Sequence, residues 1–73
     1  MTRQQTAILT AVAELARLNQ RTGASQIAAA SGLGVDTVRR VIAGMVADGA
    51  LSLLPGATVQ AGNEYRIPSG KTD

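Results

Sequence analysis

Residues 25–51, SQIAAASGLGVDTVRRVIAGMVADGAL, constrain the fold of this chain more than any other stretch. Within them, Val38, Ile42 and Met45 recur at intervals of four and three residues, which is the spacing of the buried side of an α-helix. The preceding segment, residues 31–34 (SGLG), supplies glycine where a tight turn is expected to need a positive φ. The stretch therefore predicts two helices joined by a short turn, with the second helix over residues 35–48.

The buried side of these helices determines which residues face outward. Ile27, Ala28 and Leu33 mark the buried side of the first helix and the turn. Gly49 follows the second helix at a position suited to a left-handed C-terminal cap. Two helices at a steep angle, the second with a cationic outer face, have the shape that enters a DNA major groove. The residues of the second helix that should look outward are Asp36, Arg39, Arg40, Ala43 and Ala47.

A further helix is predicted over residues 2–18, with Thr2 or Thr6 as its cap and Asn19 near its end. We expect it to be a core helix that supports the other two. The alternative is that its exposed edge, with Leu9 and Leu18, pairs with a second copy. Its buried stripe should consist of Ile8, Val12 and Leu15, widened by Leu9, Ala16 and Leu18.

Residues 19–24 form a polar connector, after which Thr22, Gly23 or Ser25 is expected to cap the next helix. In this connector, Arg21 and Thr22 either contact a phosphate or belong to a solvated loop. The free N–H groups at the start of the following helix carry partial positive charge, which suits them to a phosphate contact.

Two short strands, residues 51–54 and 64–67, are predicted at the end of the chain, with Tyr65 and Ile67 on one face. Turn-forming residues stand at both ends of the intervening segment, PGATVQAGN, which indicates a hairpin with a protruding loop. The fold class expected is mainly α with a small β-hairpin, in one domain over residues 1–68. Residues 69–73 are expected to form a mobile tail.

Composition excludes several kinds of chemistry. The 73 residues include no cysteine and no histidine, which rules out thiolate or histidine zinc sites and a histidine-based triad. No apolar run approaches the ~20 residues that span a bilayer, so we expect a cytoplasmic protein without a membrane partner. The net charge of +2 permits a nucleic-acid partner. We expect neither enzymatic activity nor a cofactor, because no sequence pattern sets two acidic groups around a pocket. The residues that could act as an acid or a base are Glu14, Asp36, Asp48 and Glu64.

The order helix, helix, turn, helix and hairpin resembles that of winged helix-turn-helix domains. Residues 27–51, IAAASGLGVDTVRRVIAGMVADGAL, are similar to the core of bacterial repressors of the IclR, MarR and GntR type. The shared features are Ile-Ala before the turn, Gly-Leu in it, Thr-Val early in the next helix and Asp-Gly-x-Leu before the hairpin. The closing EYRI of residues 64–67 resembles their last wing strand. The resemblance implies a three-helix winged helix-turn-helix fold and a sequence-specific DNA-binding regulator, and it favours a repressor.

The resemblance also indicates which residues meet double-stranded DNA. Arg39 or Arg40 is the best candidate for base reading, because arginine can bond two acceptors of guanine at once. An ordinary solvated face is the alternative for both. For Asp36 three roles remain open: accepting a hydrogen bond from a cytosine amine, positioning an arginine, or interacting favourably with the helix dipole in the first turn. The full set of predicted DNA-binding residues is Gln26, Val35, Asp36, Thr37, Arg39, Arg40, Ala43, Asn63 and Arg66.

The predicted wing departs from the family pattern, because no basic residue occurs between Leu54 and Arg66. We expect a weak wing contribution and loose binding by one copy, since phosphate contacts supply most of the affinity. A homodimer reading half-sites ~34 Å apart would compensate. No small-molecule ligand is expected. The alternative is a protein-interaction module, supported by the thin basic face and the apolar Leu53, Leu54 and Val59. Polar wing contacts could come from Thr58, Gln60 and Asn63.

Overall fold

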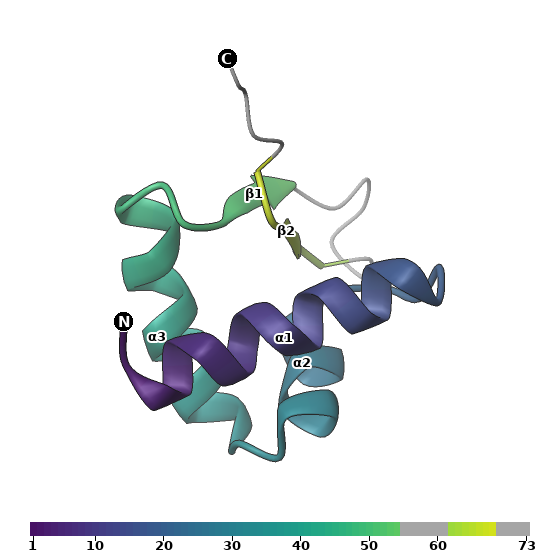
Figure 1. The fold of residues 1–73 in the computed structure, drawn as a ribbon, viewed down its shortest axis with the longest axis horizontal. Coiled ribbons are helices and arrows are strands. Elements are labelled where there is room, and N and C mark those ends of the chain that lie inside the picture. Colours follow the sequence, from purple (N-terminus) through teal and green to yellow (C-terminus); the bar gives the residue numbers. More distant parts are fainter. Residues whose placement is uncertain (55–61, 69–73) are drawn as a thin grey trace.

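A computed structural model describes residues 1–54 and 62–68 of the chain, and Figure 1 shows its fold. Three helices come first: α1 (Arg3–Arg17), α2 (Ala24–Ser31) and α3 (Val35–Ala47). Two antiparallel strands follow, β1 (Ser52–Leu54) and β2 (Glu64–Arg66). The prediction of a mainly helical fold with a small hairpin is confirmed. The predicted tail, residues 69–73, and the middle of the predicted loop, with Thr58, Val59 and Gln60, lie outside the described residues.

Both ends of α1 are fixed by side chains and backbone groups that the sequence places there. Thr2 and Gln5 form a capping box, in which the Gln5 N–H donates to the Thr2 Oγ1 at 3.1 Å and the Thr2 N–H donates to the Gln5 Oε1 at 2.9 Å. At the other end, Asn19 adopts a φ of +58°. This allows the Gln20 N–H to donate to the Leu15 carbonyl at 2.9 Å, which closes the helix with a Schellman turn.

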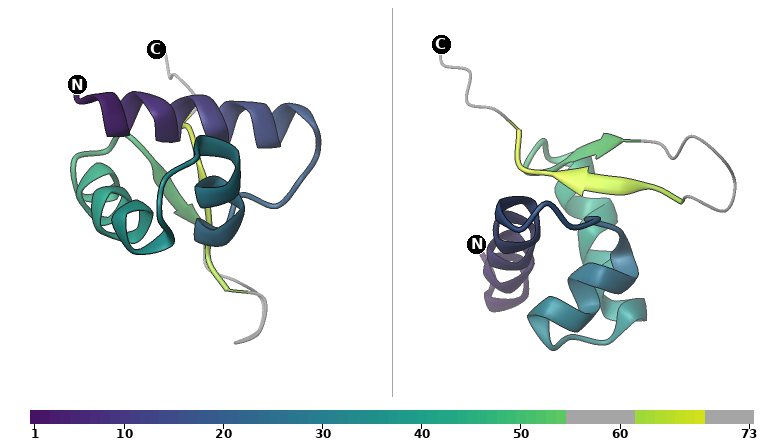
Figure 2. Two further views of the ribbon diagram at one scale, coloured as in Figure 1. Left: turned by 90° about the horizontal axis from the view of Figure 1, so that it is seen from below. Right: turned by 90° about the vertical axis from the view of Figure 1, so that its right-hand side faces the viewer.

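α1 lies across α2 and α3, with the hairpin at one end of the three helices (Figure 2). The predicted inward positions Ile8, Val12 and Leu15 are buried. The prediction that Ala16 and Leu18 widen this stripe is wrong: Ala16 is exposed, and Leu18 follows the last helical residue and is 50% exposed. The rest of the stripe is supplied instead by Ala11, which lies between Ile8 and Leu15 on the helix surface. The buried core consists of Ile8, Ala11, Val12, Leu15, Ile27, Val38, Ile42, Met45 and Leu51.

The helix-turn-helix pair forms as the glycines predict. Gly32 ends α2 in the left-handed conformation, with φ +78°, and the Leu33 N–H donates to the Ser31 Oγ at 3.3 Å. Gly34 then starts α3. Gly49, with φ +82°, closes α3 by a second Schellman turn, in which the Ala50 N–H donates to the Met45 carbonyl at 2.8 Å. α3 itself ends one residue earlier than predicted, at Ala47.

The hairpin is shorter than predicted at both outer ends. Leu51 belongs to the turn that follows α3, because its N–H donates to the Met45 carbonyl at 3.3 Å, so β1 begins at Ser52. Ser52 pairs with Arg66, and β2 therefore ends there and leaves Ile67 outside the strand. Tyr65 packs against the core, whereas Ile67 is 46% exposed, so these two residues do not share one buried face.

The other edge of β2 is attached to the connector between α1 and α2. The Tyr65 N–H donates to the Thr22 carbonyl at 3.1 Å. This bond places the start of α2 directly beside the hairpin. Three segments far apart in the sequence thereby meet on one side of the molecule: the start of α2, the exposed flank of α3 and β2.

Candidate nucleic-acid interface

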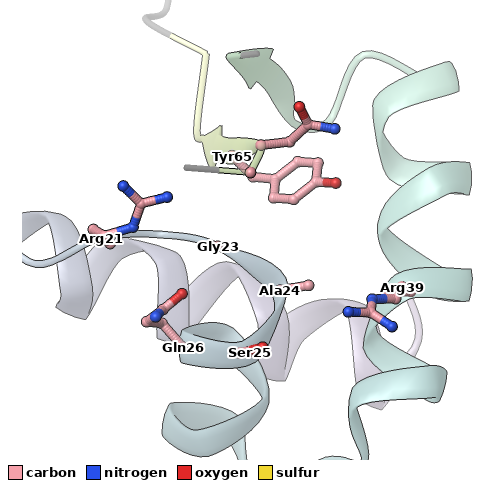
Figure 3. A pocket seen from close by; sticks show the side chains of 9 residues that line it. Arg21, Gly23, Ala24, Ser25, Gln26, Arg39 and Tyr65 are labelled. Atoms are coloured by element: carbon pink, nitrogen blue, oxygen red, sulfur yellow. The ribbon is translucent and has the colours of Figure 1, made fainter. Parts of the chain in front are cut away.

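These three segments enclose an open groove of about 710 Å³, which we call the polar groove (Figure 3). The start of α2 forms its floor, the Tyr65 side chain extends over it from β2, and Arg39 reaches into it from α3. Arg21, on the connector before α2, stands at the opposite end. Such a groove, with a guanidinium at each end, suits an anionic ligand. The lining residues are Arg21, Gly23, Ala24, Ser25, Gln26, Arg39, Gly62, Asn63 and Tyr65.

α2 begins in the polar groove without a side-chain cap. Of the three predicted caps, Gly23 occupies the position, and the first intrahelical bond runs from the Ile27 N–H to the Gly23 carbonyl at 2.9 Å. The N–H groups of the first turn therefore have no acceptor within the helix. Gln26 folds back over this end, since a Cβ on Gly23 would lie 2.6 Å from its Oε1. Glycine at the cap thus leaves room for the Gln26 amide inside the groove.

The outer face of α3 carries two exposed arginines, Arg39 and Arg40, as predicted. Neither forms an ion pair with a carboxylate in the described part of the chain. Asp36, one turn before Arg40, is likewise exposed and makes no ion pair there. The role of Asp36 in positioning an arginine therefore stays a prediction, without support from an ion pair among the described residues. Its place in the first turn of α3 agrees with its favourable interaction with the helix dipole.

Arg21 and Glu64 join the connector to β2 by an ion pair, with 3.4 Å between the Arg21 Nη1 and the Glu64 Oε2. The Arg21 side chain is about half exposed, and Glu64 is more covered. Arg21 lies between the polar groove and a smaller hollow of about 240 Å³, which Arg66 also lines. The pair partly neutralises this end of the groove, so Arg39 is its stronger cationic end.

The predicted site residues fall into three groups. Gln26, Arg39 and Asn63 line the polar groove together. Val35 and Thr37, on the first turn of α3, are half-buried, and Arg66 lines the smaller hollow. The third group lies on the exposed face of α3 outside the groove and comprises Asp36, Arg40 and Ala43.

Sequence reasoning missed part of the groove. The sequence predicts Ser25 only as a cap and Tyr65 only as a strand residue, and it leaves Arg21 open between a phosphate contact and a solvated loop. These residues come together through the hydrogen bond between Tyr65 and Thr22, which joins positions 43 apart in the chain. No local spacing encodes that contact. The one available signal was the order of elements, since a hairpin after the helix pair must pack beside it.

Other charged groups lie away from the groove. On α1, Arg17 donates to both carboxylate oxygens of Glu14, and this hydrogen bond together with the attraction of the positive charge lowers the pKa of Glu14. In the described part of the chain, no three metal-ligating side chains gather. Within the same residues, no helix has the length and apolar character needed to cross a bilayer.

Three helices, a tight turn between the last two and a C-terminal hairpin define a winged helix-turn-helix architecture. No protein-family model matches the sequence, and no curated protein matches it.

Proposed function

We propose that this protein is a small regulator that binds double-stranded DNA sequence-specifically, and that it acts as a repressor. In this proposal α3 enters the major groove and the polar groove receives the adjacent sugar-phosphate backbone. The observation that carries the proposal is the pair of exposed arginines on α3, which no carboxylate neutralises among the described residues, beside a groove with a second cation.

Charge and shape favour DNA over other partners. α3 is an α-helix, and the diameter of an α-helix with its side chains, about 10–12 Å, fits the ~12 Å width of the major groove. The start of α2, which has no side-chain cap, and Arg39 line the same groove and supply hydrogen-bond donors, and phosphate oxygens are acceptors only. The resemblance of residues 27–51 to bacterial winged-helix repressors points to the same partner.

The protein binds as a homodimer in this proposal. One copy offers few cations to the phosphates, and affinity for DNA rises with the number of phosphates neutralised. Two copies related by a twofold axis would read an inverted repeat with half-sites ~34 Å apart. The proposal includes a cytoplasmic location, because a bacterial repressor acts on DNA in the cytoplasm. The proposal involves no cofactor, no small-molecule ligand and no catalysis.

The test is selection of bound sequences from a random DNA pool, followed by gel-shift measurements on the enriched sequence. The double variant Arg39→Ala/Arg40→Ala should lose retention of that DNA, while its circular dichroism stays unchanged. The matched control is Arg3→Ala/Arg17→Ala, which removes the same charge from α1 and should retain binding. An enriched inverted repeat would support the dimer. Failure to enrich any sequence, or full retention by the α3 variant, would overturn the proposal.

A second candidate function, a protein-interaction module, is favoured by exposed aliphatic side chains on the hairpin. Leu53, Leu54 and Ile67 are 43%, 40% and 46% exposed. Exposed apolar side chains are typical of protein contacts where they gather in one patch. The salt dependence of DNA binding separates the two functions: a steep loss of affinity with rising salt supports the regulator, and indifference to DNA at low salt supports the interaction module.

A further inference from the structure

We infer that the two neighbouring arginines of α3 have different tasks: Arg39 binds a backbone phosphate in the polar groove, and Arg40 reads a base. This inference rests on the proposed function and extends it, because the sequence alone left either arginine as the base-reading residue. It follows from where the two side chains leave the helix and from what surrounds each of them.

The first observation is angular. Successive residues of an α-helix are about 100° apart around its axis. Val38, Ile42 and Met45 mark the buried side of α3, and Arg40 lies almost opposite their mean direction. Arg39 lies about 100° back from Arg40, on the flank that faces α2. A helix in the major groove presents its outermost line to the base edges and its flanks to the two backbones.

The second observation is the surroundings of Arg39. Its guanidinium extends from α3 toward the start of α2 (Figure 3). There it shares the polar groove with Gln26, Asn63 and the uncapped N–H groups of the first turn of α2. Arg40 does not line the groove. Donors converging from two helices suit the several acceptor oxygens of one phosphate, whereas a base edge offers one or two acceptors in a plane.

The third observation is the strip of exposed residues around Arg40. Apart from Arg40 and Asp36, every residue on this strip is alanine or glycine, so the helix backbone can come close to the groove floor. Arg40 is then the only long donor on the strip, and Asp36 is not paired with it among the described residues. The strip consists of Asp36, Arg40, Ala43, Gly44 and Ala47.

The experiment measures affinity for the selected DNA and for each of its single base-pair variants, at several salt concentrations. Arg39→Ala should weaken binding to all sequences alike and reduce the slope of log affinity against log salt by about 1. Arg40→Ala should relax discrimination at one base pair by about 5- to 150-fold and leave discrimination at the other positions unchanged. Arg3→Ala, on α1, is the control that should change neither quantity.

Lysine variants sharpen the distinction, because lysine keeps the charge but cannot form the bidentate fork. Arg39→Lys should keep most of the affinity and the wild-type salt slope, whereas Arg40→Lys should relax discrimination almost as much as alanine does. The reverse pattern, or equal effects of substitutions at the two positions, would overturn the division of tasks between Arg39 and Arg40. The proposed function as a DNA-binding regulator would still stand. If the wild-type protein enriches no sequence, the proposed function itself fails.

Discussion

Replacing Thr22 by valine is expected to stabilise the fold. Thr22 is only 2% exposed, and its hydroxyl oxygen has no hydrogen-bond partner among the described residues. The residue is held in place through its backbone, because its carbonyl accepts from the Tyr65 N–H at 3.1 Å. A valine side chain has nearly the same shape and would leave that backbone bond in place. The substitution therefore isolates the contribution of one buried hydroxyl.

The expected magnitude follows from the cost of burying a polar group without a partner, which is about 1–3 kcal/mol. Thr22→Val should raise the free energy of unfolding by about 1 kcal/mol, at the lower end of this range. For a domain of this size, that corresponds to a rise in Tm of about 4–8 °C. Thr22→Ser keeps the hydroxyl and loses a buried methyl group, so it should lower the stability by about 0.8 kcal/mol.

Thermal and urea unfolding followed by circular dichroism measure these changes. Thr10→Val, at an exposed position of α1, is the matched control and should alter stability by less than about 0.5 kcal/mol. A loss of stability in Thr22→Val would refute the reasoning, because it would mean that the hydroxyl makes a hydrogen bond that the valine cannot replace. DNA affinity should be the same in Thr22→Val as in the wild type, since Thr22 does not line the polar groove.

Two further predictions test the structure around α3 and β2. Gly49→Ala should destabilise the protein by about 1–2 kcal/mol, because alanine is strained at φ +82°. Gly44→Ala should stabilise it by about 0.5–1 kcal/mol, because this exposed helical position has nothing within 4 Å of an added Cβ. Urea unfolding should therefore give changes in stability of opposite sign for the two glycine-to-alanine substitutions. Glu64→Gln, which removes the carboxylate of the ion pair between Arg21 and Glu64, should change stability by less than about 1 kcal/mol and tighten DNA binding by up to about fivefold. Titrations by fluorescence anisotropy measure the affinity for DNA. The control Glu14→Gln, on α1, should leave this affinity unchanged. An equal effect of Glu64→Gln and Glu14→Gln would count against a DNA-facing Arg21.

Most of the helical fold could be predicted from the sequence, because local rules specify it. The spacing of Val38, Ile42 and Met45 is sufficient to identify the buried side of α3, and the glycines at positions 32 and 49 are needed for the positive φ that ends each helix. The errors lie where local rules compete with tertiary contacts. Leu18 fits the helical period but follows the last turn of α1, and its side chain is half exposed.

The polar groove was only partly predictable, for a physical reason. Arg39 could be assigned to an outer face because the period of one helix determines that face. Which flank of α3 adjoins α2, and hence the difference between Arg39 and Arg40, depends on how the two helices cross and where the hairpin packs. That packing rests on contacts such as the bond from Tyr65 to Thr22, and periodicity carries no information about them. The two arginines are adjacent in the sequence, but the groove beside only one of them gives them different surroundings.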